Sequence, residues 1–591
     1  MSRLEFEDIL YTVEKPGRYV GGEYNVPDMT KPHKVDFCMV FPDLYEIGMS
    51  NLGVKILYGI LNEMEDVVCQ RCFAPAKDFG LAIKQNGIPL MSIETKKPLI
   101  EFDAIGFSVQ YELSYTNIPY MLDLAGFPYY AKDRDDTYPI LMAGGPCSAN
   151  PEPYADFFDI VCIGDGEDLI VELAKILIAH KNNKAKIIES ASRLDGVYAP
   201  QRMKVVDGIT TGHVKKAVIQ NLDTAYYPIN PIVSNVESVH DRPVVELFRG
   251  CYAGCRFCQA CFIYRPMRMR SEDTVVAISE ALINNTGTEE LGYSSLSTGD
   301  YPYIKGALRR VSKLAAQKRV KMQLPSLRLD SFSDEITEWA SKASLTFAPE
   351  AGTQRLRNVI NKNITDEDID RTMSNAFKGG YTSVKLYFMI GLPTETDEDV
   401  LGIAETVRHI KDIYFQATGR GGLTASVSCA VFIPKPITPF QWVAQITVPE
   451  MERRQKLLRD ALRKIKGVSF SWLEPSMAYL EGIFARGGRE LSALIIKAYE
   501  NGALFDGWTD EYKYDIWAKS IQECGLNVDK YVSGMALSAI LPWDFIDFGI
   551  TKSFLEKEYR LALEAKTSDG CKFGCAGCGA SVYAKCQIQE R

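Results

Sequence analysis

The chain has 591 residues, of which 46% are hydrophobic and 24% charged, and its formal net charge is −9. This length predicts about three or four domains of ordinary globular composition. No uncharged apolar run of about eighteen residues occurs, so we expect no membrane span. The acidic start of the chain does not resemble a signal peptide, and we expect a cytoplasmic protein. The acidic balance disfavours extended nucleic-acid binding but leaves room for an RNA substrate that meets a local basic patch.

Fifteen cysteines without a secretory signal indicate reduced thiols and metal sites, not disulfides. Their distribution is informative. Four lie within residues 251–261 and four within residues 571–586, and the other seven are scattered.

Residues 35–180 alternate apolar strands with helical segments, which is typical of βαβ units in an open parallel sheet of the Rossmann kind. The helical segments lie near residues 50–63, 113–125 and 167–180. The expected strands are Val35–Phe41, Asp103–Val109, Ile140–Ala143 and Phe158–Ile163.

A second alternating series predicts a partial (β/α) barrel of six units, with its chemistry on the loops that follow the strands. Its expected helices include Ser271–Asn284, Ile304–Gln317 and Asp397–Ile413. Its expected strands are Val244–Phe248, Glu290–Ser295, Lys321–Leu324, Leu345–Ala348, Ser383–Ile390 and Ser426–Phe432. The predicted α/β organisation is a Rossmann-like domain (1–183), an extension and linker (184–240), the barrel (241–445), a mostly helical region (446–565) and a cysteine-rich tail (566–591).

Cys251, Cys255 and Cys258 are spaced three and two residues apart on a glycine-bearing loop after a predicted strand. Thiolates at this spacing converge on one iron–sulfur cluster, and three ligands leave the fourth iron open. Cys261 extends the run like a ferredoxin motif, but Arg265 stands before Pro266 where the ferredoxin cysteine would be. A closed four-cysteine site, a zinc site and purely structural thiols are the alternatives.

The C-x3-C-x2-C spacing with Phe257 before the last cysteine resembles the radical S-adenosylmethionine (SAM) superfamily over about residues 240–445. This resemblance implies a [4Fe–4S] cluster on Cys251, Cys255 and Cys258 that cleaves SAM reductively to methionine and a 5′-deoxyadenosyl radical. It also implies an electron donor such as flavodoxin or ferredoxin.

The same resemblance implies SAM contacts on the loops after the later strands. The residues concerned are Gly299 and Asp300 in Ser-Thr-Gly-Asp, where the superfamily has Gly-Gly-Glu, then Ser326, Arg328, Glu350 and Gly391. Ordinary turns, helix caps and structural salt bridges are the alternatives for these positions.

Residues 35–180 resemble the cobalamin-binding domain that often precedes a radical SAM barrel. The resemblance rests on the stretches around Tyr45 and Gly48, around Gly144 and Gly145, and on Ile163-Gly-Asp-Gly-Glu167. The family's lower-ligand motif is Asp-x-His-x-x-Gly, and Tyr45 occupies the histidine position. A phenol is a poorer cobalt ligand than imidazole. Cobalamin is therefore either bound without a protein imidazole or not bound, and the fold then serves the substrate or packing.

The tail repeats the three-and-two spacing at Cys571, Cys575 and Cys578, and Cys586 supplies a fourth thiol. Four thiolates fit a closed [4Fe–4S] cluster or zinc, and the third alternative is no metal. The chain as a whole resembles a bacterial family of about this length that joins a cobalamin-type domain to a radical SAM barrel. We expect a radical SAM enzyme that methylates, or inserts sulfur into, a macromolecule or metabolite. An iron–sulfur electron carrier or metal sensor, or an RNA- or ribosome-binding protein, are the competing hypotheses.

Overall fold

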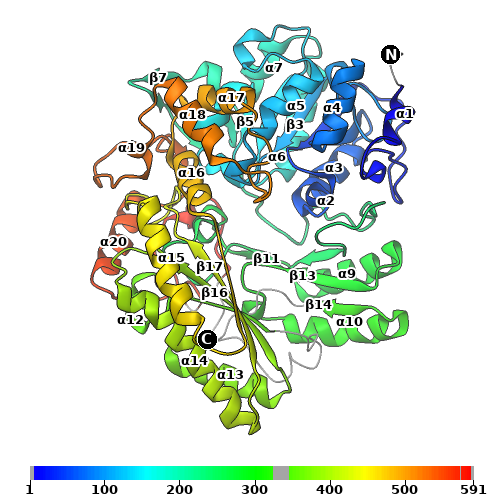
Figure 1. Cartoon of the computed structure of the whole chain (residues 1–591). Helices are drawn as coiled ribbons and strands as arrows, with labels where there is room; N and C mark the ends of the chain where they lie inside the picture. Colours follow the sequence, from blue (N-terminus) through cyan, green and yellow to red (C-terminus); the bar gives the residue numbers. More distant parts are fainter. Residues whose placement is uncertain (1–4, 324–344, 573, 588–591) are drawn as a thin grey trace.

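The structure is a computed structural model, and it describes residues 5–323, 345–572 and 574–587. Figure 1 shows an upper lobe, in which the blue and cyan N-terminal elements lie beside the orange C-terminal helices, and a lower lobe of green and yellow elements. The fold is α/β, with a parallel-sheet N-terminal domain, a partial (β/α) barrel and a helical C-terminal part.

The N-terminal sheet has six strands in the order β2-β1-β3-β4-β5-β6. All neighbours are parallel except β5 and β6. The helices are α3 (Leu52–Glu63), α4 (Lys77–Asn86), α5 (Asn117–Ala125), α6 (Glu167–Ala179) and α7 (Lys184–Ala191). The strands are β1 (Val35–Phe41), β2 (Val67–Phe73), β3 (Ala104–Ser108), β4 (Ile140–Gly144), β5 (Ile160–Cys162) and β6 (Val197–Tyr198). The four predicted strands of this domain are confirmed.

Strand β2 was not predicted, because polar Gln70 and Arg71 interrupt its apolar sequence. Both side chains are nevertheless buried and have polar partners. The Gln70 Oε1 atom accepts a hydrogen bond from the Ser92 hydroxyl at 2.7 Å, and Arg71 Nε lies 2.7 Å from a carboxylate oxygen of Glu94. Buried polar groups are stable in a strand when they are paired in this way.

The lower lobe contains two parallel sheets. The shorter has the order β10-β13-β14, from β10 (Val244–Glu246), β13 (Glu290–Ser294) and β14 (Lys321–Gln323). The longer has the order β15-β16-β17-β18, from β15 (Leu345–Glu350), β16 (Ser383–Ile390), β17 (Thr424–Val431) and β18 (Val468–Trp472). The first six confirm the strands predicted for the barrel, and β18 is an addition within the region predicted as mostly helical.

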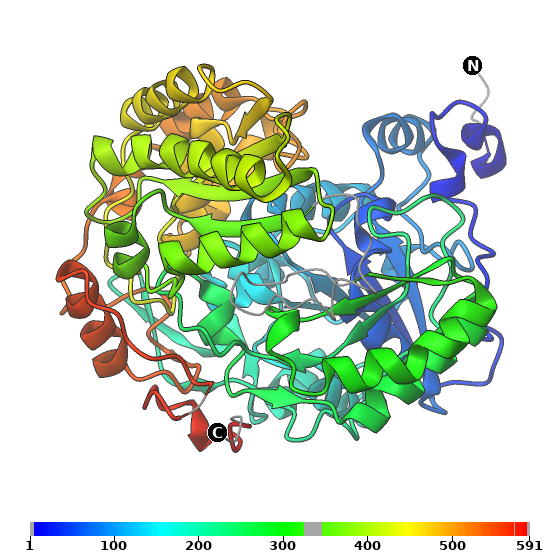
Figure 2. The ribbon, with the colours of Figure 1, turned by 90° about the horizontal axis from the view of Figure 1, so that it is seen from below.

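Helices flank both sheets of the lower lobe. Figure 2 shows green and yellow-green helices on opposite sides, with strands between them. The helices are α9 (Glu272–Thr286), α10 (Ile304–Lys318), α12 (Gln354–Val359), α13 (Asp366–Lys378), α14 (Asp397–Thr418) and α15 (Val448–Leu462).

The C-terminal helices pack on the N-terminal domain, although the sequence predicted a separate region. Phe484 contacts Tyr115 edge to face at 5.3 Å, and the Asn150 amide donates to the carbonyl of Gly487 at 2.9 Å. In addition, β19 (Ile546–Asp547) pairs with β9 (Val214–Lys215), which lies in the predicted linker. The helices are α16 (Pro475–Arg486), α17 (Leu491–Glu500), α18 (Tyr514–Cys524), α19 (Asp529–Val532) and α20 (Lys552–Leu563). No helix in the described part of the chain combines the length and apolar character that a membrane span requires.

Candidate functional site: the cysteine loop and the cavity above it

The first cysteine cluster lies on a loop that leaves the barrel at β11 (Phe248–Arg249) and returns at the antiparallel strand β12 (Arg268–Met269). We call residues 250–267 the cluster loop. The loop begins at Gly250, whose φ of 90° is in the left-handed region, and a Cβ there would lie 2.8 Å from the Met267 sulfur. The short helix α8 (Gln259–Ile263) then begins directly after Cys258. The sequence therefore places its cysteines on a tight turn, as predicted.

The thiols of the cluster loop are withdrawn from solvent. Cys251, Cys255 and Cys261 are buried and Cys258 is half-buried. Burial raises the pKa of the Cys258 thiol to about 12. A hydrogen bond with Cys251 lowers the pKa of the Cys261 thiol to about 6, and the nearby Arg265 guanidinium acts in the same direction. Soft thiol donors in this setting match the chemistry of iron–sulfur ligation.

Glu350 lies near the cluster loop, because it pairs with Lys362, which contacts Phe257 of that loop. The Lys362 ammonium lies 3.2 Å from a carboxylate oxygen of Glu350 and 6.0 Å from the ring centre of Phe257. It also contributes to the electrostatic environment of Cys258. Glu350 has a φ of 70°, an uncommon conformation for a residue other than glycine, and such strain is concentrated at functional sites. The position predicted for SAM binding after the fourth barrel strand is therefore next to the cluster loop.

Asp300 lies at the end of the loop after β13 and is buried. Its two carboxylate oxygens already accept contacts, one from the Ser297 hydroxyl at 2.5 Å and one from the Lys572 ammonium at 2.8 Å. Gly299 is beside it in the same short turn. In this structure Asp300 binds the ammonium group of Lys572. Its predicted contact with the ammonium group of SAM stays a prediction.

Gly391 directly follows β16, with a φ of 82° that favours glycine. Its N–H donates to a carboxylate oxygen of Glu395 at 2.7 Å, and burial raises the pKa of Glu395 to about 7. This turn ends a parallel strand, where ligands of such sheets bind. Ser326 and Arg328, the two remaining predicted SAM contacts, lie outside the described residues.

A cavity of about 430 Å³ lies between the N-terminal sheet and the barrel. Because it opens at the carboxyl ends of β3, β4 and β5, it occupies the place where open α/β sheets bind ligands. Gly145 has a φ of 114°, and a Cβ there would lie 2.4 Å from the carbonyl oxygen of Val109. Other lining residues are Gln110, Gly144, Ser148, Cys162, Phe248, Arg249, Tyr264 and Ser295.

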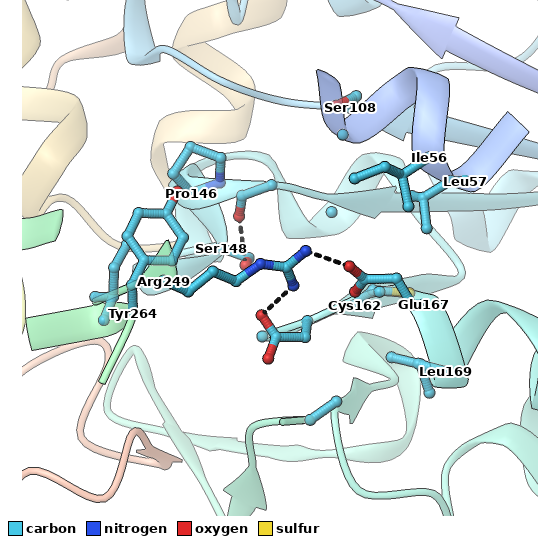
Figure 3. Close-up of a pocket in the computed structure, with 18 of the residues that line it drawn as sticks. Ile56, Leu57, Ser108, Pro146, Ser148, Cys162, Glu167, Leu169, Arg249 and Tyr264 are labelled. Carbon is cyan, nitrogen blue, oxygen red and sulfur yellow. Dashed lines mark hydrogen bonds and ion pairs between the residues drawn. The ribbon is translucent and has the colours of Figure 1, made fainter. Parts of the chain in front are cut away.

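Arg249 connects the cavity to the cluster loop (Figure 3). Its guanidinium extends from β11 to Asp165, at 3.0 Å, and to Glu167, which both follow β5 of the N-terminal sheet. A third carboxylate, that of Glu246, lies 2.8 Å from Nε. Arg249 is two residues before Cys251. The charge contacts that join the two lobes are therefore adjacent to the predicted cluster ligands.

Tyr45 and Gly48, predicted to contact cobalamin, do not line this cavity. The Tyr45 hydroxyl donates to Glu23 at 3.1 Å and accepts from the Asn235 amide at 3.2 Å, and its ring packs against Phe73. A Cβ at Gly48 would lie 2.2 Å from that same phenylalanine ring. Tyr45 is therefore buried in the core of the N-terminal domain, and the predicted contacts of both residues with cobalamin stay predictions. Gly144 and Gly145 do line the cavity, as expected.

The tail cysteines lie next to the cluster loop. The Cys571 N–H donates to the carbonyl of Tyr252 at 2.7 Å, and Arg265 contacts both Cys261 and Cys578. Among the described residues, no three His, Cys, Asp or Glu side chains already form a metal-coordinating group. Coordination by either set of thiols therefore stays a prediction.

Sequence reasoning missed the residues that join the lobes. Asp165 and Glu167 belong to the glycine-rich stretch Ile163-Gly-Asp-Gly-Glu167, and Arg249 is part of Arg249-Gly250-Cys251. Each of these residues lies beside a motif that the sequence analysis identified, and this proximity could have indicated a role in the site. The pairing between them is not visible in a sequence, because more than 80 residues separate the partners.

Comparisons with known proteins agree with this geometry. Residues 53–200 match the model of the N-terminal region of radical SAM proteins, and residues 245–407 match that of the radical SAM superfamily. An uncharacterized protein of Methanocaldococcus jannaschii is 29% identical over 456 residues, which are 77% of this chain and 89% of that protein.

Two solved structures are also similar. One is the cobalamin-dependent SAM radical enzyme OxsB with aqua-cobalamin and SAM bound (TM-score 0.47, 12% identity, 91% of this chain and 80% of that chain). The other is the radical SAM methyltransferase TsrM from Kitasatospora setae, with cobalamin and a [4Fe–4S] cluster bound (TM-score 0.46, 13% identity, 67% and 72%). On the two family matches, this chain is an enzyme of the radical SAM superfamily and carries the N-terminal region of radical SAM proteins.

Proposed function

We propose that this enzyme holds a [4Fe–4S] cluster on Cys251, Cys255 and Cys258, binds SAM at the open iron, and holds a cobalamin in the cavity between its lobes. The reaction we propose is methylation, since alkyl transfer is the chemistry that a corrinoid adds to SAM. The observation that carries the proposal is the cavity at the strand ends, which reaches Arg249 and Gly250 immediately before the first cysteine.

The thiols fit the cluster by donor type and by position. All three lie on one loop of eight residues from Cys251 to Cys258, between a strand and a helix. When bound there, the cluster supplies one electron to the SAM sulfonium and so yields methionine and a 5′-deoxyadenosyl radical. The chain's own part is to keep the thiols out of water and to place Lys362 and Glu350 beside them. A flavodoxin or ferredoxin would supply the electron.

The residues that line the cavity could hold a corrinoid, and none of those described would supply an imidazole to its cobalt. The glycines at 144, 145 and 166 leave backbone exposed at the strand ends, where a large ligand can approach closely. The hydroxyl of Ser148 and the amide of Gln110 offer polar contacts for the amide side chains of such a ligand. No histidine is found among the described residues that line the cavity.

The ion pairs around Arg249 join the proposed cobalamin cavity to the cluster loop. Asp165 and Glu167 hold the guanidinium from the N-terminal side, and Arg268 of β12 contacts the same aspartate. Because these groups are buried, the contacts are screened little by salt. These contacts hold the wall of the cavity against the cluster loop.

The test is anaerobic reconstitution with iron, sulfide and hydroxocobalamin, followed by assay of 5′-deoxyadenosine from SAM. We expect wild-type protein to form 5′-deoxyadenosine and to retain one equivalent of cobalamin after gel filtration. Replacing Gly145 by Val, which fills the strand end, should abolish cobalamin retention and leave the iron content unchanged. Equal cobalamin retention by both proteins would contradict the placement of cobalamin in this cavity.

A further inference from the structure

The C-terminal tail packs against the cluster loop. Its first cysteine pairs by its backbone with Tyr252, and a Cβ at Gly570 would lie only 2.3 Å from the Tyr252 carbonyl oxygen. At its other end, the N–H of Gln587 donates to the carbonyl of Met267 at 3.0 Å, and the Tyr252 hydroxyl donates to the Gln587 carbonyl at 3.0 Å. The tail thus contacts both arms of the cluster loop.

The tail thiols face inward to different degrees. Cys571 and Cys578 are buried, Cys586 is half-buried and Cys575 is exposed. Cys571, Cys575 and Cys578 all lie within electrostatic range of the Cys586 thiol. The described part of the tail contains one short turn at Ala580–Val582, and Cys578 and Ala580 are buried in the core that also contains Phe554.

Arg265 supplies a second, independent observation. Its side chain is buried, with only 2% of the residue exposed. Nη2 lies 3.7 Å from the Cys261 sulfur, and the guanidinium is hydrogen-bonded to the Cys578 thiol. Its Nε and Nη1 atoms have no hydrogen-bond partner, and no carboxylate pairs with it among residues 5–323, 345–572 and 574–587. A buried donor without a partner is costly, so these two atoms of Arg265 are available to a further acceptor beside Cys261 and Cys578.

We propose that Cys571, Cys575, Cys578 and Cys586 form a second metal centre, and that Arg265 is the residue that compensates its charge. Four thiolates around zinc or around a [4Fe–4S] cluster carry a net negative charge, which a neighbouring guanidinium offsets. Hydrogen bonds from an arginine to ligating sulfur also stabilise such centres. The centre closes the tail onto Tyr252 and Met267 and so supports the cluster loop from outside.

The experiment isolates this centre from the SAM cluster. The test uses a full-length variant in which Cys251, Cys255 and Cys258 are all replaced by Ala. If the centre is a cluster, this variant should contain about four irons per chain after anaerobic reconstitution; if it is a zinc site, it should contain about one zinc as purified, without reconstitution. In that background, Cys578→Ser should lower the metal content at least fivefold. Cys524→Ser, which removes a half-buried thiol outside both sets, should leave it unchanged.

Arg265 is tested in the same background by a matched pair. Arg265→Gln removes the charge and should lower the metal content at least threefold, whereas Arg265→Lys keeps the charge and should retain most of it. Metal content unaffected by Arg265→Gln would overturn the role of this residue.

The same measurements separate this proposal from the proposed function. Absence of metal from the triple variant, with a circular dichroism spectrum like that of wild type, would overturn the tail centre while leaving the SAM cluster untouched. If the triple variant does not fold, Cys571→Ser/Cys578→Ser in the native chain decides. The proposal predicts loss of about half the iron, or of the zinc alone, and unchanged metal would refute it.

Discussion

Asp165→Asn tests the ion pairs that join the two lobes. The Asp165 carboxylate contacts Arg249 at 3.0 Å, Arg268, and the Ile219 N–H at 2.9 Å. Burial alone would raise its pKa, but the two guanidinium groups lower it from 3.8 to about 2. At roughly 1.4 kcal/mol for each tenfold change in proton affinity, this corresponds to about 2.5 kcal/mol of stability. Removing one partner of a buried pair costs up to about 5 kcal/mol, because the remaining charge is left uncompensated.

The pH dependence follows from the sign of this shift. A carboxyl whose pKa is depressed in the folded state stabilises the fold above its unfolded-state pKa, and this stability is lost as pH falls through the folded-state value. We therefore expect Asp165→Asn to lower the free energy of unfolding by about 2 to 5 kcal/mol at pH 7, with the difference shrinking between about pH 4 and pH 2. The assay is urea unfolding of apoprotein followed by tryptophan fluorescence. Asp412→Asn, at an exposed helical position, is the control. Superimposable curves at pH 7, or a difference that grows below pH 4, would refute the reasoning.

Three further predictions concern the thiols, the cobalt and the strand-end glycine. Cys251→Ala should abolish the iron–sulfur absorption of the SAM cluster, whereas Cys261→Ala should keep it, and equal loss in both would show that the ligand triplet is wrong. The EPR spectrum of bound cob(II)alamin should lack hyperfine splitting from a histidine nitrogen, and Tyr45→Phe should keep the cofactor, because Tyr45 is in the core. Gly145→Ala should cost more unfolding free energy than Gly126→Ala, since both glycines have positive φ but only the first meets a carbonyl oxygen at 2.4 Å. Equal urea midpoints would contradict that clash.

Most of the strands could be predicted because their apolar residues are contiguous and their boundaries are marked by glycine and polar residues. The Val35–Phe41 and Ser383–Ile390 strands were predicted with the bounds that the structure has. Strand β2 was not predicted, because the buried Arg71 is paired with glutamates that lie far from it in the sequence. The packing of α16 and α17 on the N-terminal domain was not predicted either, because contacts between distant residues produce no local pattern in the sequence.

Some parts of the candidate site could be predicted from the sequence, and others could not. The cysteine spacing is a local property, so the cluster loop could be found from the sequence. Tyr45 was assigned from its position in a motif, whereas its hydroxyl donates to Glu23 in the core, so its contact with cobalamin stays a prediction. The role of Arg265 required the structure as well. The sequence shows only that a cysteine is absent there, and two of the surrounding thiols, those of Cys571 and Cys578, come from more than 300 positions away.

The central claim is that Cys251, Cys255 and Cys258 hold the cluster at which SAM is cleaved. The most direct measurement is the yield of 5′-deoxyadenosine from SAM by anaerobically reconstituted, dithionite-reduced protein, compared among wild type, the three single Cys→Ala variants and Cys524→Ala. The account predicts turnover by wild type and by the Cys524 variant, and a loss of at least a hundredfold in each of the other three. Turnover retained after replacement of any one of those three, or absent from fully reconstituted wild type, would contradict it.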